Sequence, residues 1–467
     1  MALLNDKTVT RTLLLFCAVT FCLCVHAQNA TSLKNVRSVY VGSLGTNEGV
    51  EDLRHELIET LRRLHRLTIV SSADQADAVL EGKGGLWIRG YRSLSPRARA
   101  NPSSAEPIYA GYLSIRVQGK DGETLWSYFA NPRRISFSGL KHDLASQLVS
   151  KLWDDISNAT DTTVAATSPT GAVATLRGAG ATFPFPIYHD WFHSFHARHP
   201  NWQFEYQPIG SEAGLKQLEA GTIDFAGSDI PGPASVVQIP TVGGAVVLIY
   251  NLPRFGDELR LTAEAVADIF SGKIKAWNDP ALRAINRRSS LPNTPITVVH
   301  RADGSGTTFA LAEYLMKATG RKIEWSVGEV ATGNEGVAKQ VAATPNSIGY
   351  VEFIYAFDHH LSFASVANSS GRFIQADLPS IKAAAENYQI SIANAPGEDA
   401  YPISTFSWLM FREPMEAAKR EAMMSFLEWM LTSGQRECSA LGYAPLPKSL
   451  VDRELATIRK ISVNTTP

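Results

Sequence analysis

A short run of glycine and hydroxyl residues, placed between a predicted strand and a predicted helix, constrains this chain more than any other feature. It runs from His300 to Thr308 in the order His-Arg-Ala-Asp-Gly-Ser-Gly-Thr-Thr. Residues 295–299 are mostly β-branched and predict a strand, and residues 309–316 have amphipathic helical spacing. A helix that starts here presents free N–H groups at the positive end of its dipole. The run therefore predicts an anion site, with a plain N-capped helix as the alternative.

The residue types within the run fit the same interpretation. Gly304 and Gly306 let the backbone approach a ligand closely, and Ser305 and Thr307 add hydroxyl groups. Arg301 adds a planar, permanently charged guanidinium. We expect Asp303 to hold this guanidinium in place through an ion pair.

The chain contains two more junctions of this kind. A predicted strand at 174–178 leads through residues 179–184, which include Thr182 and Phe183, into a predicted helix at 186–198. A second strand, at 203–207, leads through Gly210 to Glu212 into a helix at 213–220, for which Ser211 is the expected N-cap. Ligands of open α/β sheets bind beyond the carboxyl ends of the strands. We therefore expect the three junctions to share one anion pocket.

Length and charge place further limits on the chain. With 467 residues, 45% of them hydrophobic, it can form two or three packed domains. The formal net charge of −1 provides no general attraction to nucleic acid or to an acidic membrane. An anion must therefore be captured by a local site.

Residues 1–27 have the pattern of a cleaved signal peptide. Basic residues precede the apolar run 13–25, which is too short to span a membrane, and a small-residue cleavage pattern predicts a mature start near Gln28. Large residues precede Cys22 and Cys24, which argues against a lipid anchor. We expect an exported protein that retains one cysteine, Cys438, and so contains neither an internal disulfide nor a cysteine metal cluster.

Residues 34–157 predict a small α+β domain, and the Ser, Thr, Ala, Pro and Gly-rich residues 158–175 predict a linker. Strands are expected at 37–42, 67–70, 111–117 and 124–129, and helices at 50–64 and 140–156. This domain also contains a basic patch with interleaved aromatic residues, made of Lys83, Trp87, Arg89, Tyr91, Arg92, Arg97 and Arg99. We expect a solvated hairpin tip, with attachment to an anionic envelope polymer as the alternative; nucleic acid is not an expected partner of an exported protein.

Residues 176–450 resemble the periplasmic phosphate-binding proteins of ATP-driven phosphate importers (the PstS-like family). The matching stretches follow the family order: GAGATFPFPIY, YQPIGSEAGLKQLEAGTIDFAGSDIP, FSGKIKAWND, HRADGSGTTF, NSIGYVEFIYA and YPISTFS. The resemblance implies a two-lobed α/β type II periplasmic-binding-protein fold over 176–455. It places residues 176–250 and 403–455 in one lobe and 251–401 in the other, with crossings near Tyr250 and Pro402.

The resemblance also implies a function. It predicts a periplasmic, non-enzymatic protein that captures inorganic phosphate, needs no cofactor or metal, and delivers the ion to a membrane permease. The implied phosphate contacts are Thr182, Phe183, Ser211, Asp229, Arg301, Ser305, Gly306 and Thr307.

Two carboxylates need a separate explanation. Hydrogen phosphate keeps a proton at neutral pH that it can donate to Asp229, whereas sulfate has none, so Asp229 is the expected selectivity element. A helix cap is the alternative role for Asp229. Glu212 departs from the usual Ser-Gly-Gly of the family. It is expected either to act as a second carboxylate beside the pocket or to face solvent at the first helical turn.

Other functions remain open at this point. A phosphate sensor or scavenger would use the same pocket without a permease, and a structural adhesin would act through the N-terminal domain. A phosphatase-like hydrolase would use Ser305 as the nucleophile and His300 as the base. A histidine series at 189, 193, 196 and 199 suggests either a solvated helix face or a metal site.

Overall fold

The computed structural model describes residues 32–93, 105–131, 136–158, 172–253, 255–386 and 391–463. The predicted signal peptide, most of the predicted linker, and Arg97 and Arg99 of the basic patch lie outside these residues. Among the helices of the described residues, none combines the length and the apolar character that a membrane span requires.

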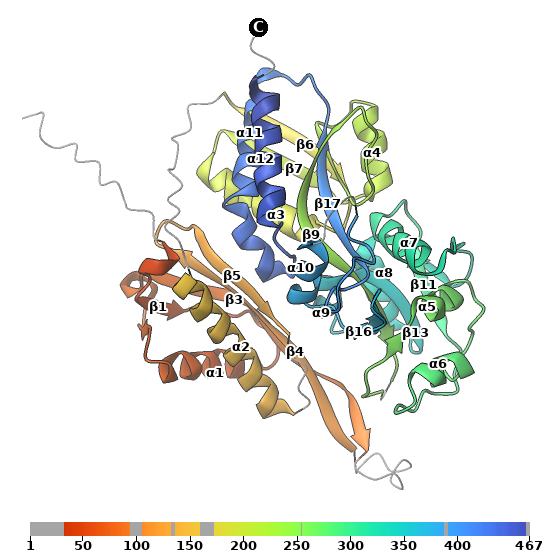
Figure 1. The fold of residues 1–467 in the computed structure, drawn as a ribbon. Coiled ribbons are helices and arrows are strands. Elements are labelled where there is room, and N and C mark those ends of the chain that lie inside the picture. The colour runs from red at the N-terminus through yellow and green to blue at the C-terminus, as the bar shows by residue number, and fades with distance from the viewer. Residues whose placement is uncertain are drawn as a thin grey trace, which may run out of the picture.

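The N-terminal region forms a five-stranded sheet with two long helices on one face (Figure 1). Its elements are η1 (Leu33–Asn35), β1 (Ser38–Val41), α1 (Val50–Arg63), β2 (Thr68–Ile69), η2 (Ala73–Gln75), β3 (Ala78–Ser93), β4 (Ala105–Gly119), β5 (Thr124–Ala130) and α2 (Phe137–Asn158). The strand order is β2-β1-β3-β4-β5. Leu53, Leu57 and Leu61 recur at helical spacing along α1, and all three are buried in the core of this region. The predicted elements of this region are thus confirmed, with shifts at their ends.

The expectation of a solvated hairpin tip at the basic patch is wrong for Trp87 and Arg89, which pack on the C-terminal region, whereas Tyr91 is exposed. The antiparallel pair of β3 and β4 extends to Ser93, so Lys83, Trp87 and Arg89 lie within a paired strand. The Trp87 ring stacks on His360 of the C-terminal region, with 4.6 Å between ring centroids. Pattern alone could not distinguish a solvated strand face from one that packs on another domain.

A nine-stranded sheet organises the remainder of the chain, with the path β12-β11-β13-β9-β17-β8-β6-β7 and β14 beside β9. Its long strand β9 (Val237–Asn251) changes partners midway. Residues 237–245 pair with β17 (Ser404–Phe411), and residues 246–251 pair with β13 (Ser347–Glu352). We call the elements on the β17 side, residues 172–245 and 403–463, the first lobe. Residues 246–402 are the second lobe, so the change of partners precedes Tyr250 by a few residues.

The first lobe contains β6 (Ala174–Gly180), α3 (Phe185–Arg198), β7 (Trp202–Gln207), α4 (Ser211–Glu219), β8 (Phe225–Ser228), β17, α11 (Ala417–Leu431), η4 (Gly434–Leu441) and α12 (Lys448–Val463). The second lobe contains β10 (Arg260–Leu261), α5 (Ala263–Phe270), α6 (Pro280–Ile285), β11 (Thr297–Arg301), α7 (Gly306–Thr319), β12 (Glu329–Ala331), α8 (Gly333–Ala343), β13, α9 (Phe353–Asp358), β14 (Ser362–Phe363), β15 (Ser365–Ala367), β16 (Phe373–Ile374) and α10 (Leu378–Glu386). The predicted α/β class of this region, preceded by a further region of strands and helices, is confirmed.

Each lobe contains three mutually parallel strands whose carboxyl ends lead toward the other lobe. In the first lobe β6 pairs in parallel with β7 and β8, and in the second lobe β11 pairs in parallel with β12 and β13. Helices α3, α4, α7 and α8 start directly after four of these strands. Their N-termini therefore supply backbone donors from both lobes to one region.

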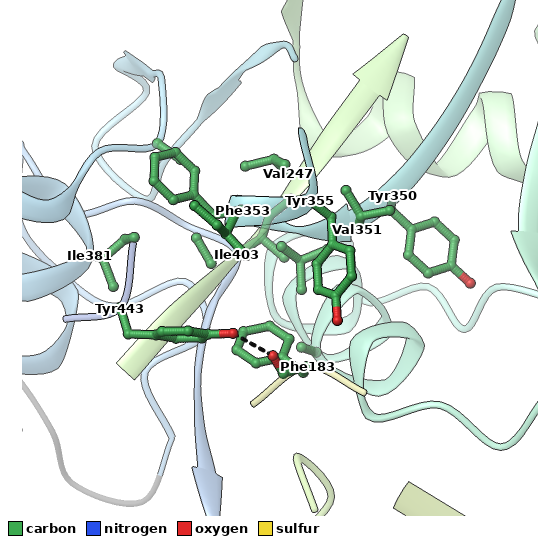
Figure 2. Packing of buried hydrophobic residues seen from close by; sticks show 14 of the residues in the cluster. Phe183, Val247, Tyr350, Val351, Phe353, Tyr355, Ile381, Ile403 and Tyr443 are labelled. Atoms are coloured by element: carbon green, nitrogen blue, oxygen red, sulfur yellow. Dashed lines mark hydrogen bonds between the residues drawn. The ribbon is translucent and has the colours of Figure 1, made fainter. Parts of the chain in front are cut away.

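Buried aromatic residues from both lobes pack beside the loop that follows β6. Figure 2 shows Phe183 and Tyr443 of the first lobe beside Tyr355 and Phe353 of the second. The Tyr443 hydroxyl donates to the Phe183 carbonyl oxygen at 2.6 Å, and the Tyr355 hydroxyl donates to the Thr182 carbonyl oxygen at 2.9 Å. The loop after β6 is thus held by side chains of both lobes.

Candidate functional site

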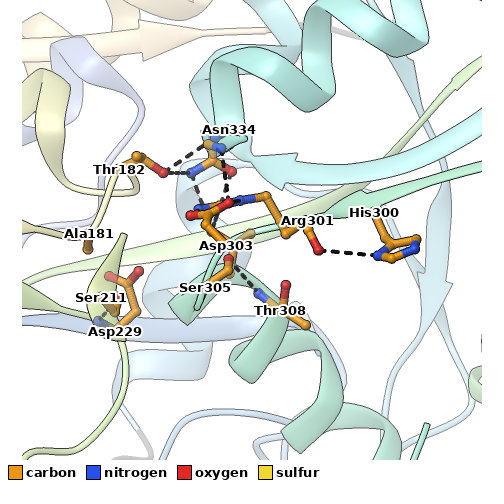
Figure 3. A network of polar contacts seen from close by, with 12 residues as sticks. Ala181, Thr182, Ser211, Asp229, His300, Arg301, Asp303, Ser305, Thr308 and Asn334 are labelled. Carbon is orange, nitrogen blue, oxygen red and sulfur yellow. Dashed lines mark hydrogen bonds and ion pairs between the residues drawn. The ribbon is translucent and has the colours of Figure 1, made fainter. Parts of the chain in front are cut away.

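Arg301 ends strand β11 with its guanidinium almost completely buried. Its side chain is 1% exposed, and Nε donates to Asp303 Oδ1 at 2.7 Å while Nη2 donates to the second carboxylate oxygen. Burial acts to raise the pKa of the Asp303 carboxyl, but the Arg301 guanidinium outweighs it and holds that pKa below its ordinary value. Asp303 Oδ1 also accepts the Gly333 N–H at 3.1 Å. The predicted ion pair is confirmed, and it fixes the direction of the guanidinium (Figure 3).

The start of helix α7 is pressed against the first lobe. Ser305 is its N-cap, and its hydroxyl accepts the Thr308 N–H at 3.1 Å. A Cβ added at Gly306 would lie 2.5 Å from Asp229 Oδ2 and 2.6 Å from Ser211 Oγ. Only glycine allows the helix start to approach the first lobe this closely. The junction is therefore both a capped helix start, through Ser305, and a contact between the lobes, through Gly306.

Ser211 lies opposite this helix start but does not cap its own helix. The N-cap of α4 is Gly210, with φ of 96°, and no side chain completes that cap, so the expectation for Ser211 is wrong. A residue with positive φ is needed there, and glycine adopts it without strain. Ser211 is fully buried, and its hydroxyl instead accepts the Asp229 N–H at 3.3 Å.

Thr182 contacts the second lobe through Asn334, a residue that sequence reasoning missed. The Asn334 side-chain amide donates to Thr182 Oγ1 at 3.0 Å and lies 3.3 Å from Thr307 Oγ1. Thr307 Oγ1 in turn accepts an N–H of Arg301 at 3.4 Å. We call Thr182, Ser211, Arg301, Thr307 and Asn334 the donor cluster. Figure 3 shows Thr182, Asn334 and Arg301 directed toward one another from separate elements.

Asp229 is the buried carboxylate beside the donor cluster. It follows β8 and is 1% exposed. The next element is strand β9, so Asp229 does not cap a helix. Burial raises its pKa to about 7, although hydrogen bonds from Ser407 and Ser211 and the charge of Arg301 oppose that rise. The Ser407 hydroxyl donates to Asp229 Oδ1. When it is ionised, the Asp229 carboxylate can accept a hydrogen bond from a protonated oxygen of a ligand.

Glu212 lies at the edge of the site and faces solvent. Its side chain is 55% exposed and pairs with Lys216 of the next helical turn at 2.9 Å. Its backbone N–H donates to the Gly304 carbonyl oxygen at 3.1 Å, which joins α4 of the first lobe to the Arg301 loop. A pocket of about 580 Å³ opens beside this loop, between Glu212, Arg301 and Trp325. The loop is therefore reachable from solvent, although the guanidinium itself is buried.

The geometry does not assemble a nucleophile and a base. The Ser305 hydroxyl is used as the helix cap, and His300 Nδ1 lies 3.2 Å from the Arg301 carbonyl oxygen. Figure 3 shows the His300 ring directed away from Ser305. The hydrolase arrangement considered from sequence is therefore not formed by these two residues.

The histidine series on α3 serves different contacts. The rings of His189 and His193 lie 4.6 Å apart, whereas His196 Nδ1 lies 2.8 Å from the Trp202 carbonyl oxygen. Within the described ranges, no group of three or more His, Cys, Asp or Glu residues is placed to hold a metal ion.

Taken together, the donor cluster and Asp229 can hold a small oxyanion. Hydroxyl groups, one guanidinium and one carboxylate come from both lobes: Arg301, Thr307, Asn334 and Thr182 are linked by hydrogen bonds, and Gly306 lies close to Ser211 and Asp229. The predicted contacts Thr182, Ser211, Asp229, Arg301, Gly306 and Thr307 are neighbours in this arrangement. Phe183 and Ser305 adjoin them in the chain, at the loop after β6 and at the cap of α7.

Comparisons with known proteins identify the family of residues 165–433. Residues 165–433 match the model of the PBP superfamily domain. The phosphate-binding protein PstS of Pasteurella multocida is 38% identical over 60% of this chain and 88% of its own length. PstS of Xylella fastidiosa (strain Temecula1) is 39% identical over 59% of this chain and 82% of its own.

Among solved structures, a phosphate-binding protein from Stenotrophomonas maltophilia is 22% identical, with a TM-score of 0.47, and the match covers 61% of this chain and 94% of that one. The family model spans more than half of the chain, and the relatives are matched over most of their length. The chain therefore belongs to the periplasmic-binding-protein superfamily, within the PstS-like family.

Proposed function

We propose that this protein binds inorganic phosphate between its two lobes and acts as the substrate-binding protein of an ABC-type phosphate importer. The observation that carries the proposal is the meeting of Thr182, Ser211 and Arg301 from separate segments beside the buried Asp229. The proposed phosphate contacts are Thr182, Phe183, Ser211, Asp229, Arg301, Ser305, Gly306 and Thr307. Asp303 supports the site by orienting Arg301, and Glu212 borders it.

The chemistry of the site suits a dehydrated phosphate ion. Removing a dianion from water is costly unless its oxygens meet many donors, and each charge-assisted hydrogen bond contributes about 1.5–3 kcal/mol. Arg301 provides the positive charge, and the starts of α3, α4 and α7 provide backbone N–H groups. The hydroxyl groups of Thr182, Ser211 and Thr307 can donate to the remaining oxygen lone pairs.

Asp229 gives the site its selectivity for phosphate over sulfate. Hydrogen phosphate can donate its proton to the Asp229 carboxylate, whereas sulfate would place its own negative oxygen against that carboxylate. The burial of Asp229 makes this repulsion strong because solvent screens it little. The same residue therefore favours one tetrahedral ion and rejects another of similar size.

Transport follows from capture and lobe movement. Relatives named phosphate-binding protein PstS support this role. The exported chain would work in the periplasm, without a cofactor and without catalysis, and its closed form would dock on a membrane permease. The lobes would open and close about the strands that connect them, where β9 changes partners.

Isothermal titration calorimetry tests the proposal. The protein, without its predicted signal peptide and freed of bound anion by dialysis, is titrated with phosphate and separately with sulfate at pH 7.5. We expect one phosphate per chain, and sulfate binding weaker by about a hundredfold or more. No heat with phosphate, or equal affinity for the two ions, contradicts the proposal.

A further inference from the structure

The N-terminal sheet has one face covered by its own helices and the other covered by the C-terminal region. Helices α1 and α2 pack on the first face (Figure 1). On the other face, Tyr112 and Phe129 belong to the core cluster of the C-terminal region. Both rings contact Phe357 of α9, with centroid distances of 5.6 Å and 4.9 Å. The second face of this sheet is therefore an interaction surface whose partner is the remainder of the same chain.

This surface holds the first lobe through charged and polar contacts. Arg116 of β4 pairs with Asp190 of α3, and Glu123, at the turn before β5, pairs with Arg198 at the end of α3. The Ser127 hydroxyl donates to a main-chain carbonyl of η4 at 2.5 Å and accepts a main-chain N–H of η4 at 3.1 Å. These contacts fix β4 and β5 on the first lobe.

The same surface also holds the second lobe, through strand β3. Trp87 lies on the ring of His360 with an interplanar angle of 14°. Arg89 Nη2 donates to the carbonyl oxygens of Gly256 and Asp257 at 3.0 Å and 3.1 Å. One sheet is thus attached on both sides of the strands that connect the lobes.

We propose that the N-terminal domain, residues 32–158, stabilises the closed arrangement of the lobes and thereby slows the release of bound phosphate. This inference rests on the proposed function. A rotation of the second lobe relative to the first cannot preserve both sets of contacts, because a single sheet carries both. Opening must break one set, and contacts that are made only in the closed form shift the equilibrium toward that form.

The N-terminal domain lies outside the part of the chain that matches the family. The matched family model starts at residue 165, after the whole of this domain. The Pasteurella multocida relative is covered over 88% of its length by 60% of this chain. Control of release by the N-terminal domain is therefore an addition to the region that carries the phosphate site.

Release kinetics test the proposal. The full chain without its predicted signal peptide is loaded with radiolabelled phosphate and diluted into excess unlabelled phosphate, and the loss of label is followed. Trp87→Ala combined with Arg89→Ala is expected to speed release by about tenfold. Arg62→Ala is the matched control, because this arginine is exposed on helix α1 and pairs with Glu59 of the same helix, so release should stay at the wild-type rate.

A charge exchange at the first lobe provides a second test. Arg116→Glu alone and Asp190→Arg alone should each speed release, because each places like charges together. The two changes combined restore an opposite pair and should return the rate toward the wild-type value. Circular dichroism establishes that each variant is folded.

Two failures are distinguishable. If wild type binds phosphate but none of these variants alters its release, the role of the N-terminal domain is wrong and the phosphate site stands. If wild type does not bind phosphate, the proposed function itself fails.

Discussion

The two lobes contribute opposite charges to the same site. The first lobe supplies Thr182, Ser211 and a buried carboxylate, Asp229, whereas the second lobe supplies the buried guanidinium of Arg301. Arg301 is paired with Asp303 and also donates to the Thr307 hydroxyl, so its guanidinium is buried and held in one orientation by its own lobe. Under the proposed function this difference is a division of roles: the second lobe would attract an anion, and the first lobe would discriminate by whether that anion carries a proton.

The comparison also shows why closure matters. Asn334 of the second lobe bonds Thr182 of the first, and the α7 start at Gly306 touches Asp229. Attraction and discrimination therefore act together only when the lobes meet. Substitutions in one lobe should therefore change either attraction or discrimination and leave the other intact.

The largest effect is expected from removing the charge of the second lobe. Arg301→Ala should weaken phosphate binding by about a thousandfold or more, because the anion loses its guanidinium and meets the carboxylate of Asp303 unpaired. Arg301→Lys keeps the charge without the planar fork and should fall between that variant and wild type. Calorimetry measures both, and an alanine variant that binds within tenfold of wild type would show that the second lobe is not the attracting side.

Asp229→Asn removes discrimination on the other side. The amide can donate to an oxyanion, so the preference for phosphate over sulfate should fall by about a hundredfold, mainly because sulfate binds better. Ser407→Ala is the control: it removes a hydrogen-bond partner of Asp229 and keeps the carboxylate, so the preference should persist. Competition between the two ions measures the ratio, and an unchanged ratio in Asp229→Asn refutes the assignment.

The same carboxylate predicts a pH dependence of stability. Its pKa is about 7 in the folded protein against an ordinary 3.8, so between these values the folded state keeps a proton that the unfolded state has lost. The resulting stabilisation is fully present below 3.8 and is lost as the pH rises to about 7.

Urea unfolding without phosphate, for wild type and Asp229→Asn, isolates this contribution. Relative to the variant, wild type should lose about 2 kcal/mol of unfolding free energy between pH 5 and pH 7. Glu437, whose pKa is also raised to about 7 by burial, is present in both proteins and cancels. A difference that does not change with pH would show that the folded protein does not raise the pKa of Asp229.

The division between the lobes was only partly predictable from sequence. The junction at Arg301 follows local rules, since Asp303 is two residues away and the Ser305 cap is set by the helix that follows. Asn334 starts a helix through a similar Thr-Gly-Asn junction, but its strand β12 has three residues and weak burial, which leaves little hydrophobic pattern to detect. Ser407 contacts Asp229 across 178 residues through the register of β17, and no local pattern encodes that contact.

The same limit applied to the N-terminal domain. Its strands and helices could be predicted from alternation and helical spacing, because those patterns report which residues are buried. Which element covers a strand face is a tertiary property, so the basic and aromatic pattern at Trp87 and Arg89 predicts a solvated tip although both residues pack on the second lobe.

The smallest effect is expected at Glu212, which has the same charge type as Asp229 in a different environment. Its carboxylate is 55% exposed and pairs with Lys216, so solvent and salt screen its repulsion of the bound anion. Glu212→Gln should strengthen phosphate binding by less than about threefold, and the gain should disappear in 0.5 M salt, where the screening length is only about 4 Å. A gain above tenfold that survives high salt would mean that Glu212 turns into the closed site. The first lobe would then test its ligand with two carboxylates, and a more protonated ion would be the preferred one.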